Sequence, residues 1–489
     1  MLHKHKTFLS VIAVSGLFAG IAMAQDAKAV LEAADKAMGG GNLKSIQYSA
    51  TGHAFTFGQA LNPKADWPSL IVTAYTRTVD YPSMSSREEQ TRTQENPPVH
   101  GGGFPFAGEQ KSVALVSGSY AWNQAGNQAQ PAFGAADERQ LQIMLTPHGF
   151  IKAAMANNAT VKNGRGGKVV SFTALGKYKV SGVIDKANMV TETETWVANP
   201  VLGDMPIETM YSNYKDFGGV KFPTAIIQKQ GGSPVLNITV SDVKTNVANA
   251  ALEAPANVRD AKAPPVRVVS KKLGDGIWFL GGGSHNSVLV EYKDYLTVIE
   301  APLSEERSLA VIDEVKKLVP NKPIKYLVNT HTHFDHTSGL RTYMAEGATI
   351  ITNELNKPYY EKIAKMPHTL VPDKQAQSPK KVAVIGVKEK YVLTDGNQTL
   401  EFYKVEGDNH SETMMMAYLP KAKVLVEADA FTPPAQQGGP LASDLAKSFG
   451  VNLYNNVQRL KLDVSTIAPL HGDVCPFSWL ATAVGKSST

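Results

Sequence analysis

Hydrophobic positions recur with a helical spacing near the start of the chain and with a spacing of two after it. Residues 26–38 place Val30, Ala34 and Met38 on one face, and the glycines at 39–41 end the predicted helix. The following segments alternate hydrophobic and polar residues, as strands do when one side faces a core. Strands are predicted at 46–50, 70–75, 83–93, 113–122, 169–172, 178–181, 190–197, 207–214, 224–228 and 235–240.

The first half is therefore predicted to be mainly antiparallel β structure. Residues 135–156 have helical spacing, and residues 213–220 predict a hairpin with a glycine turn. The polar segment 83–93 predicts an edge or solvent-facing strand, and residues 97–108, rich in Pro, Gly and Phe, predict a mobile loop. Many antiparallel strands with few helices indicate a curved sheet or open barrel, similar in pattern to the half-barrels of periplasmic lipoprotein carriers.

Strands and helices alternate in the second half. Residues 251–266, rich in Ala and Pro, predict a linker between a β-rich domain at 25–250 and a second domain at 267–489. Beyond the linker, strands are predicted at 277–280, 287–291, 295–300, 323–330, 349–352, 390–394, 399–404, 414–419, 424–426 and 466–468, and helices at 304–318, 353–363 and 444–460. The predicted fold class is α+β with two domains.

Composition agrees with two soluble globular domains. The 489 residues exceed what a single core holds, and 43% are hydrophobic and 19% charged. The net charge of +5 falls to +3 without Lys4 and Lys6, and neither value indicates a nucleic-acid partner. Because Cys475 is the only cysteine, an internal disulfide and a cysteine-based zinc site are both excluded.

Residues 1–24 have the pattern of a secretory signal peptide. Lys4 and Lys6 form a basic start, residues 8–21 are apolar, and Ala22-Met23-Ala24 is a cleavage sequence. The apolar run is short for a membrane span, and no later segment is long and apolar enough for one. We therefore expect a periplasmic or secreted protein without a stable membrane span after the signal is removed.

Metal-binding side chains are concentrated in one short segment. His331, His333, Asp335 and His336 follow a predicted buried strand at 323–330 and precede a predicted helix. Several side chains can converge on one point at such a turn, and imidazole nitrogens with a carboxylate suit zinc, iron or manganese. His331 and His333 would bind one metal, and Asp335 and His336 a second.

This H-x-H-x-D-H spacing resembles the signature of the metallo-β-lactamase superfamily, and the resemblance extends from about Val266 to the end of the chain. It implies an αβ/βα sandwich and two zinc ions, or iron or manganese in their place. The later ligand positions of that family are matched by His410, Asp429 and His471, each close after a predicted strand. By analogy, one metal would be held by His331, His333 and His410, the other by Asp335, His336 and His471, and Asp429 would bridge them.

Two further residues, Glu300 and His285, are candidates for a role beside this site. Family members commonly have Asp where this chain has Glu300, which implies a different arrangement around the metal ligands. His285, in a glycine-rich hairpin, is a candidate for contact with substrate or with a ligand. The remaining isolated histidines are expected to be surface or packing residues, namely His53, His100, His148 and His368.

The resemblance implies a dinuclear zinc hydrolase that acts on a small molecule. Two close cations lower the pKa of a shared water, and the bridging hydroxide would attack an ester, lactone, thioester or related substrate. Asp335 would be catalytic, orienting the nucleophile and accepting its proton. The loops at 353–389 and 431–450 would select the substrate, but neither has a decodable motif, and the sequence does not indicate an oligomeric state.

Three alternatives remain open. Export favours a β-lactamase, although β-lactamases generally have Cys or Ser at the position of Asp429. Mononuclear iron sulfur dioxygenases of the same fold resemble the chain at His331, His333, His410 and Asp429. In the third alternative, the first half carries a ligand and the second half has lost catalysis. The complete ligand set favours the hydrolase.

Overall fold

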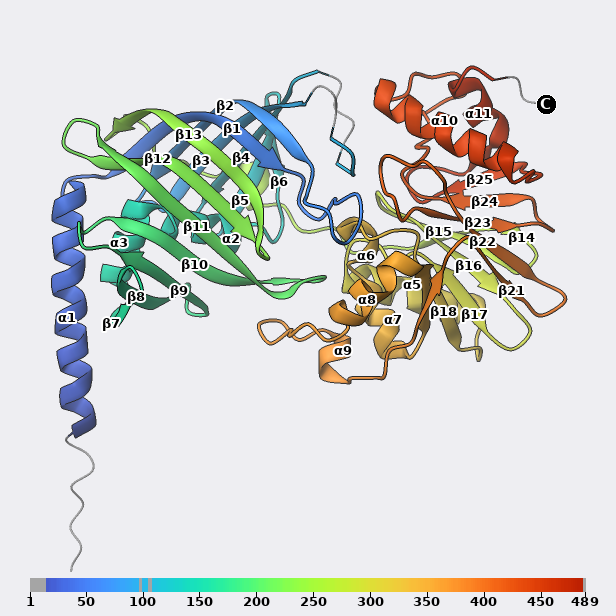
Figure 1. Ribbon diagram of the computed structural model, residues 1–489, viewed down its shortest axis with the longest axis horizontal. Coiled ribbons are helices and arrows are strands. Elements are labelled where there is room, and N and C mark those ends of the chain that lie inside the picture. Colours follow the sequence, from blue (N-terminus) through green and yellow to red (C-terminus); the bar gives the residue numbers. More distant parts are fainter. Residues whose placement is uncertain (1–14, 96–98, 104–107, 487–489) are drawn as a thin grey trace, which may run out of the picture.

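The computed structural model describes residues 15–95, 99–103 and 108–486, and it places a curved β-sheet beside a layered α/β region (Figure 1). The curved sheet has 13 strands in the order β6-β5-β4-β3-β2-β1-β13-β12-β11-β10-β9-β8-β7, and all neighbouring pairs are antiparallel. Its strands are β1 (Ser45–Phe55), β2 (Ser69–Asp80), β3 (Ser85–Gln94), β4 (Gln110–Ser117), β5 (Tyr120–Ala125), β6 (Gln128–Pro131), β7 (Thr160–Gly164), β8 (Gly167–Ala174), β9 (Tyr178–Ile184), β10 (Val190–Asn199), β11 (Gly203–Asp216), β12 (Lys221–Gln230) and β13 (Ser233–Thr245).

Three helices pack against one side of this sheet, namely α1 (Ser15–Met38), α2 (Ala136–Met144) and α3 (Pro147–Ala156). The helix α1 does so with its C-terminal half at one end of the sheet (Figure 1). Leu31 and Met38 of α1 and Phe150 of α3 pack in one buried cluster with sheet residues such as Ile46 and Phe222. The predicted curved antiparallel sheet is confirmed, because its alternating residues meet the helices on one side only.

Three predictions about this sheet are corrected by the structure. The segment 83–93 is no edge strand, because β3 pairs with both β2 and β4. The predicted strand 113–122 is the β4–β5 hairpin, which turns at Gly118 with φ 52°. The predicted helix 135–156 is divided at Pro147, where Thr146 has an extended backbone and its side chain caps α3.

The second region contains two more sheets with helices outside them. A seven-stranded sheet has the order β14-β15-β16-β17-β18-β19-β20, and a six-stranded sheet the order β21-β22-β23-β24-β25-β26. The strands are β14 (Val269–Gly274), β15 (Ile277–Gly281), β16 (Ser287–Glu291), β17 (Leu296–Ile299), β18 (Ile324–Val328), β19 (Thr349–Asn353), β20 (Val384–Val387), β21 (Lys390–Thr394), β22 (Thr399–Lys404), β23 (Met415–Leu419), β24 (Val424–Glu427), β25 (Thr466–Pro469) and β26 (Cys475–Pro476). The helices are α5 (Glu305–Leu318), α6 (Phe334–Thr337), α7 (Leu340–Glu346), α8 (Lys357–Ile363), α9 (Lys374–Gln377), α10 (Asp444–Arg459) and α11 (Phe477–Ala483), with a short 3₁₀ turn at Glu354–Asn356.

The inner faces of the two sheets form one core. Val290 and Val328 from the first sheet are buried in the same cluster as Phe402 and Met416 from the second. On the outer side of the first sheet, a separate cluster joins α5, α7 and α8 to residues such as Leu327. This arrangement is the predicted αβ/βα sandwich, and it leaves the strand ends free to carry the site.

The predicted linker is partly ordered against the curved sheet. It contains α4 (Ala256–Arg259), whose Val258 is buried with Ala254 against Val113 and Trp122. A segment rich in Ala and Pro can therefore be a packed connection, because its few apolar side chains find a hydrophobic face.

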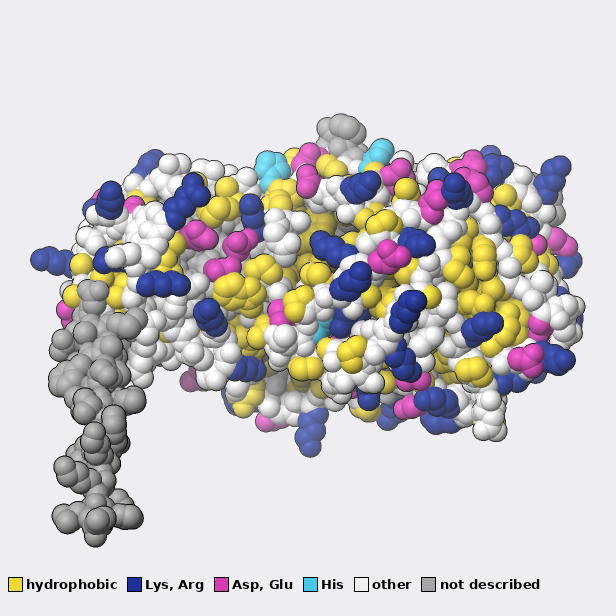
Figure 2. Space-filling model, turned by 60° about the horizontal axis from the view of Figure 1, so that its bottom comes forward, with side chains coloured by type: hydrophobic (Ala, Val, Ile, Leu, Met, Phe, Trp, Pro, Cys, Tyr) yellow, Lys and Arg dark blue, Asp and Glu magenta, His cyan; other side chains and the backbone are white. Residues whose placement is uncertain are grey.

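Two expectations about the N-terminal half involve residues outside the described ranges. The predicted signal peptide begins in residues 1–14, and α1 already runs from Ser15 through the predicted cleavage point, so cleavage stays a prediction. The predicted loop 97–108 is described only in part, at 99–103 and at Gly108. Among the residues that the structure describes, no helix is long and apolar enough to cross a membrane. On the face shown in Figure 2, basic and acidic side chains are interspersed.

Candidate metal centre

Ligand-type side chains from several loops meet at one edge of the two sheets. His331 and His333 follow β18, and Asp335 and His336 lie on the short helix α6. The other three follow the strands of the second sheet, namely His410 after β22, Asp429 after β24 and His471 after β25. The seven residues that the resemblance implied as ligands are thus brought together by the fold.

One group consists of His331, His333, His410 and Asp429, whose ligand atoms all lie within 4.8 Å of one another. His331 Nε2 is 2.9 Å from His333 Nδ1 and 3.3 Å from Asp429 Oδ2. His410 Nε2 is 3.6 Å from the same carboxylate oxygen. Three imidazoles and a carboxylate at this separation form a complete ligand set for a tetrahedral or larger metal site.

A second group consists of His285, Asp335, His336 and His471, again within 4.8 Å of one another. His336 Nε2 is 3.1 Å from His471 Nε2, and His285 Nε2 is 3.1 Å from Asp335 Oδ2. His285 was predicted only as a contact residue. The structure places it among the ligand-type atoms themselves, because the glycine-rich turn after β15 folds over the site.

Asp429 connects the two groups. Its Oδ1 lies 3.0 Å from His471 Nε2, and its Oδ2 lies 2.7 Å from His336 Nε2 and 3.3 Å from His331 Nε2. The residue has φ 57°, a left-handed conformation that is costly for a non-glycine residue and common at functional sites. The backbone is thus held in a strained form that points this carboxylate between the groups.

The hydrogen bonds around the first group fit a cation between its ring nitrogens. Thr330 donates its hydroxyl hydrogen to Glu300, so its oxygen accepts from His331 Nδ1 at 3.0 Å. The carbonyl of Ala60 accepts from His333 Nε2 at 3.0 Å. His331 Nε2 and His333 Nδ1 therefore face each other as lone pairs, an arrangement that a metal ion would stabilise.

The hydrogen bonds around the second group also leave a ring-nitrogen lone pair directed at the other ligand atoms. The carboxylate of Glu300 accepts from His336 Nδ1 at 3.1 Å, which leaves His336 Nε2 as a lone pair directed at Asp429 and His471. In addition, both ring nitrogens of His410 and the Oδ2 of Asp429 are buried without a hydrogen-bond partner among the described residues. Buried polar atoms without partners are rare, and their convergence here fits two metal ions.

Glu300 holds ligands of the centre in place through hydrogen bonds. As the resemblance suggested, it is not expected to be a ligand itself. It is fully buried, has φ 76°, and binds three neighbours through its carboxylate: Asn329, Thr330 and His336. The longer side chain of Glu, compared with Asp, lets it reach both the loop before His331 and the ring of His336. It therefore fixes the tautomer of one ligand and the loop that carries others.

The charges of the site depart strongly from their ordinary values. Burial, together with the neighbouring histidines, lowers the pKa of His331 well below its usual range and that of His333 to about 3. Burial alone would raise the pKa of Asp429, but His336, His471 and His410 hold it well below its usual range. The neutral rings of His331 and His333 and the ionised carboxylate of Asp429 are in the protonation states that bind metal ions. Burial alone would lower the pKa values of His336 and His410, but Asp429 raises both, so a metal ion at these rings would displace a proton.

The curved sheet supplies part of this centre. The loop between β1 and β2, residues 56–68, extends to α6 (Figure 1). Within it, Gln59 Nε2 donates to Asp335 Oδ1 at 2.8 Å, and Ala60 accepts from His333 as described above. Gly103 N donates to the Oε1 of Gln59 at 3.1 Å, which fixes the orientation of the Gln59 amide.

Apolar contacts anchor this loop on α6. The rings of Phe57 and Trp67 pack edge-on against Phe334, with centroids 5.2 and 6.2 Å away. Gly102 lies so close to the ring of His333 that an added Cβ would be 2.4 Å from its Cε1. No motif in the sequence pointed to Gln59, Ala60 or Gly102, because their role comes from a contact between distant segments.

The other histidines that the structure describes belong to neither ligand group. His148 is buried against Phe222, and its Nε2 donates to the carbonyl of Met38 at 3.1 Å, as in a packing residue. His53 and His100 are exposed. His368 was expected at the surface, but it is only 7% exposed, because the β10–β11 turn at Gly203 covers it and Asp373 lies 3.5 Å from its ring.

Comparison with known proteins identifies the second region. The model of the metallo-beta-lactamase superfamily matches residues 280–471. Residues 280–471 belong to the metallo-beta-lactamase superfamily. Outside the metallo-beta-lactamase domain, the N-terminal region is a separate β-rich part. The match and the two ligand groups support a metal-dependent hydrolase.

Several known proteins are similar to parts of this chain. A metallo-beta-lactamase from Pontibacter korlensis is 19% identical over 45% of this chain and 98% of its own, with a TM-score of 0.34. A flavodiiron protein from Giardia intestinalis is 18% identical over 45% of this chain and 59% of its own, with a TM-score of 0.35. A linear primary-alkylsulfatase from Pseudomonas sp is 36% identical over 61 residues, which are 12% of this chain and 9% of the alkylsulfatase.

Proposed function

We propose that the chain is an exported hydrolase that uses two zinc ions to cleave an ester-type bond in a small molecule. The observation that carries the proposal is the pair of ligand groups joined by Asp429, each complete enough for its own metal. A mononuclear oxygen-using site would need only the first group. The second group, with four ligand-type residues, favours the dinuclear hydrolase.

The ligand atoms favour zinc. Both groups offer imidazole nitrogens and carboxylate oxygens, and Cys475, the only cysteine, is buried in the core between the sheets. Zinc binds readily to such donors, and iron or manganese would be the alternatives. When bound, two such ions would lower the pKa of a shared water and polarise the bond to be cleaved.

Residues at the solvent-accessible side of the centre would contact the substrate and accept the proton of the nucleophile. The side chains of His331 and His336 are fully buried, whereas those of Asp335 and His471 are 32% and 19% exposed. A substrate therefore approaches over the second group. Asp335 has one oxygen, Oδ1, held by Gln59, and the other, Oδ2, directed at His285, so Oδ2 is placed to orient a nucleophile and accept its proton.

The substrate class is an ester, a lactone, a thioester or a sulfate ester. Asp429 in the bridging position argues against a dedicated β-lactamase, since Cys or Ser is usual there. The relative named a linear primary-alkylsulfatase supports adding alkyl sulfates to the candidates. The signal-peptide pattern of residues 1–24 supports export to the periplasm or the medium.

Metal content and turnover test the proposal together. Purified protein would be analysed for zinc, iron and manganese, and assayed on aryl esters, lactones, thioesters, nitrocefin and octyl sulfate. We expect about two zinc ions per chain and hydrolysis that Asp429→Ala abolishes. Asp463→Ala removes an exposed carboxylate far from the site and serves as the matched control. One iron per chain without any hydrolysis would sink the proposal.

A further inference from the structure

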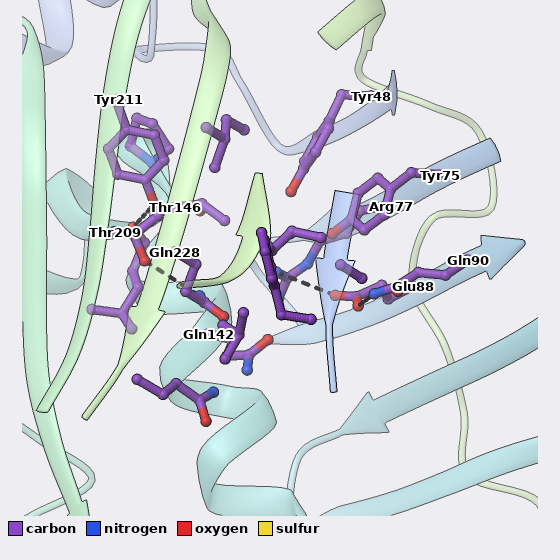
Figure 3. Close-up of a pocket in the computed structure, with 18 of the residues that line it drawn as sticks. Tyr48, Tyr75, Arg77, Glu88, Gln90, Gln142, Thr146, Thr209, Tyr211 and Gln228 are labelled. Atoms are coloured by element: carbon purple, nitrogen blue, oxygen red, sulfur yellow. Dashed lines mark hydrogen bonds and ion pairs between the residues drawn. The ribbon is translucent and has the colours of Figure 1, made fainter. Parts of the chain in front are cut away.

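The curved sheet holds a polar cavity of about 200 Å³, and none of the residues that line it is a candidate metal ligand. Its lining comes from β1, β2 and β3 on one side and from β11, β12 and β13 on the other, and the junction of α2 and α3 forms its floor. Figure 3 shows Tyr48, Tyr75 and Arg77 facing Thr209, Tyr211 and Gln228 across it. At liquid density of roughly 30 Å³ per molecule, the cavity would hold about seven waters.

A buried arginine dominates this cavity. Arg77 is 7% exposed, and its Nη1 lies 3.6 Å from Glu88 Oε2, which is too far for a hydrogen bond. The Nε of Arg77 is buried without a hydrogen-bond partner. Burying a charged group in this incompletely paired state is costly, so a second acceptor beside Arg77 would relieve that cost.

The charges of the lining favour an anion as that acceptor. Glu88 accepts from Gln90 at 2.6 Å, so one of its oxygens is already engaged. Arg77 and Arg92 are the basic residues of the lining, and Glu88 is its acidic residue. A monoanion beside Arg77 would complete the pairing of that guanidinium.

The rest of the lining favours an apolar tail. Phe222, Ile226 and Leu236 contribute hydrophobic surface on the same side as Gln228. The planar guanidinium of Arg77 matches a carboxylate, which can accept two parallel hydrogen bonds. The volume limits the tail to a few carbons.

We propose that this cavity is a second ligand site of the protein, which binds a short-chain carboxylate with its head on Arg77 and its tail against Phe222 and Ile226. The site is independent of the metal centre. It gives the N-terminal sheet a binding role of its own, in addition to its contacts with α6.

The test is calorimetric titration of the full metal-loaded protein with hexanoate, with hexanol and hexylammonium as neutral and cationic comparisons. Because a carboxylate can also bind metal ions, the decisive measurement is the change caused by variants in the cavity. Arg77→Met with Glu88→Gln removes both charges of the buried pair and leaves Arg92 in place. Lys111→Met with Glu89→Gln makes the same changes to an exposed pair whose acid is the next residue of β3, on the opposite face.

We expect the wild-type protein to bind hexanoate saturably at one site. The Arg77 and Glu88 double variant should lose this binding or weaken it about tenfold or more, and the Lys111 and Glu89 double variant should leave it unchanged. Gln230→Trp, at the end of β12, would block the cavity without touching the buried pair, and decides the matter if the double variant does not fold. The proposal is overturned if hexanoate shows no saturable heat, if hexanol binds equally, or if binding survives in both cavity variants.

Discussion

The side chain of Gln59 donates a hydrogen bond of 2.8 Å to Oδ1 of Asp335, although the two residues are 276 positions apart. The backbone N–H of Gly103 donates to Oε1 of the same Gln59 amide. One oxygen of Asp335 is thereby fixed by the N-terminal sheet, and the other is left for the metal centre. A ligand carboxylate restrained in this way loses little freedom when it binds a metal.

Replacing Gln59 should therefore weaken the second metal site. We expect Gln59→Ala to lower the affinity for one of two zinc ions by about 10- to 100-fold, because Asp335 is released. Competition with a chromogenic chelator measures this without any substrate. Gln124→Ala, at a half-buried position on β5, is the matched control. Equal zinc affinities in wild type and Gln59→Ala would show that the hydrogen bond does not position Asp335.

Glu300 should matter for metal binding although it is not expected to be a ligand. In Glu300→Gln, one acceptor oxygen becomes an NH₂ group, so the contact with Asn329 on one oxygen and those with Thr330 and His336 on the other cannot all be kept. We expect a loss of metal affinity of about 10- to 100-fold, measured by the same competition. The buried Gln140, whose amide caps carbonyls of the N-terminal sheet, offers a control for a buried polar change in Gln140→Leu. Retention of full affinity in Glu300→Gln would contradict this role.

Removal of metal should destabilise the protein. Without cations, the facing lone pairs of His331 and His333 and the buried Oδ2 of Asp429 lack hydrogen-bond donors. With free zinc at 1,000 times its Kd, the metal contributes about 4 kcal/mol to the free energy of unfolding, so chelation should lower Tm by several degrees. Thermal unfolding with and without chelator measures the change. Chelation should lower the Tm of Asp429→Ala by less than that of wild type. An equal decrease in both proteins would argue against metal binding at this site.

The N-terminal sheet should lose stability in acid through His148. Burial lowers the pKa of His148 to about 4, whereas the unfolded chain titrates near 6.5. The unfolded state therefore binds more protons between these values, so the contribution of His148 is complete above pH 6.5 and is lost as the pH falls to 4. The loss amounts to about 3 kcal/mol.

Urea unfolding at pH 7.5 and pH 4.5 tests this contribution. His148→Gln cannot titrate, so the difference in stability between wild type and the variant should shrink at the lower pH. Effects of pH on the metal centre cancel in that comparison. A difference that is the same at both pH values would contradict the assignment.

The metal ligands could be predicted from the sequence because they lie directly after strands, where the order of the chain fixes their place. The strand before His331 and those before Asp429 and His471 end at the same edge, so a local pattern was enough. The polar strand β3 was misplaced at an edge for a physical reason. Its Glu88, Gln90 and Arg92 face a polar cavity instead of solvent, and an alternating pattern does not distinguish the two.

Contacts between distant segments could not be predicted. In the sequence, Gln59 and Ala60 are ordinary loop residues, and their role arises only because the β1–β2 loop contacts α6. His368 has no burial signal in the sequence, because the β10–β11 turn that covers it is distant along the chain. His285 could be predicted only in part. Its glycine-rich hairpin indicated a turn, but the sequence did not show that this turn lies against the metal ligands. Such residues are found only when the three-dimensional arrangement is known.

The bond between His333 and the carbonyl of Ala60 joins positions 273 residues apart, and it has a consequence for the order of assembly. The Ala60 segment is synthesised long before His333, so the centre waits for the closure of a very long loop, one of the slower events in folding. A metal ion would be held firmly only after both regions have folded and met. Retention of metal would then report that the entire chain has reached its native form, in whichever compartment folding finishes.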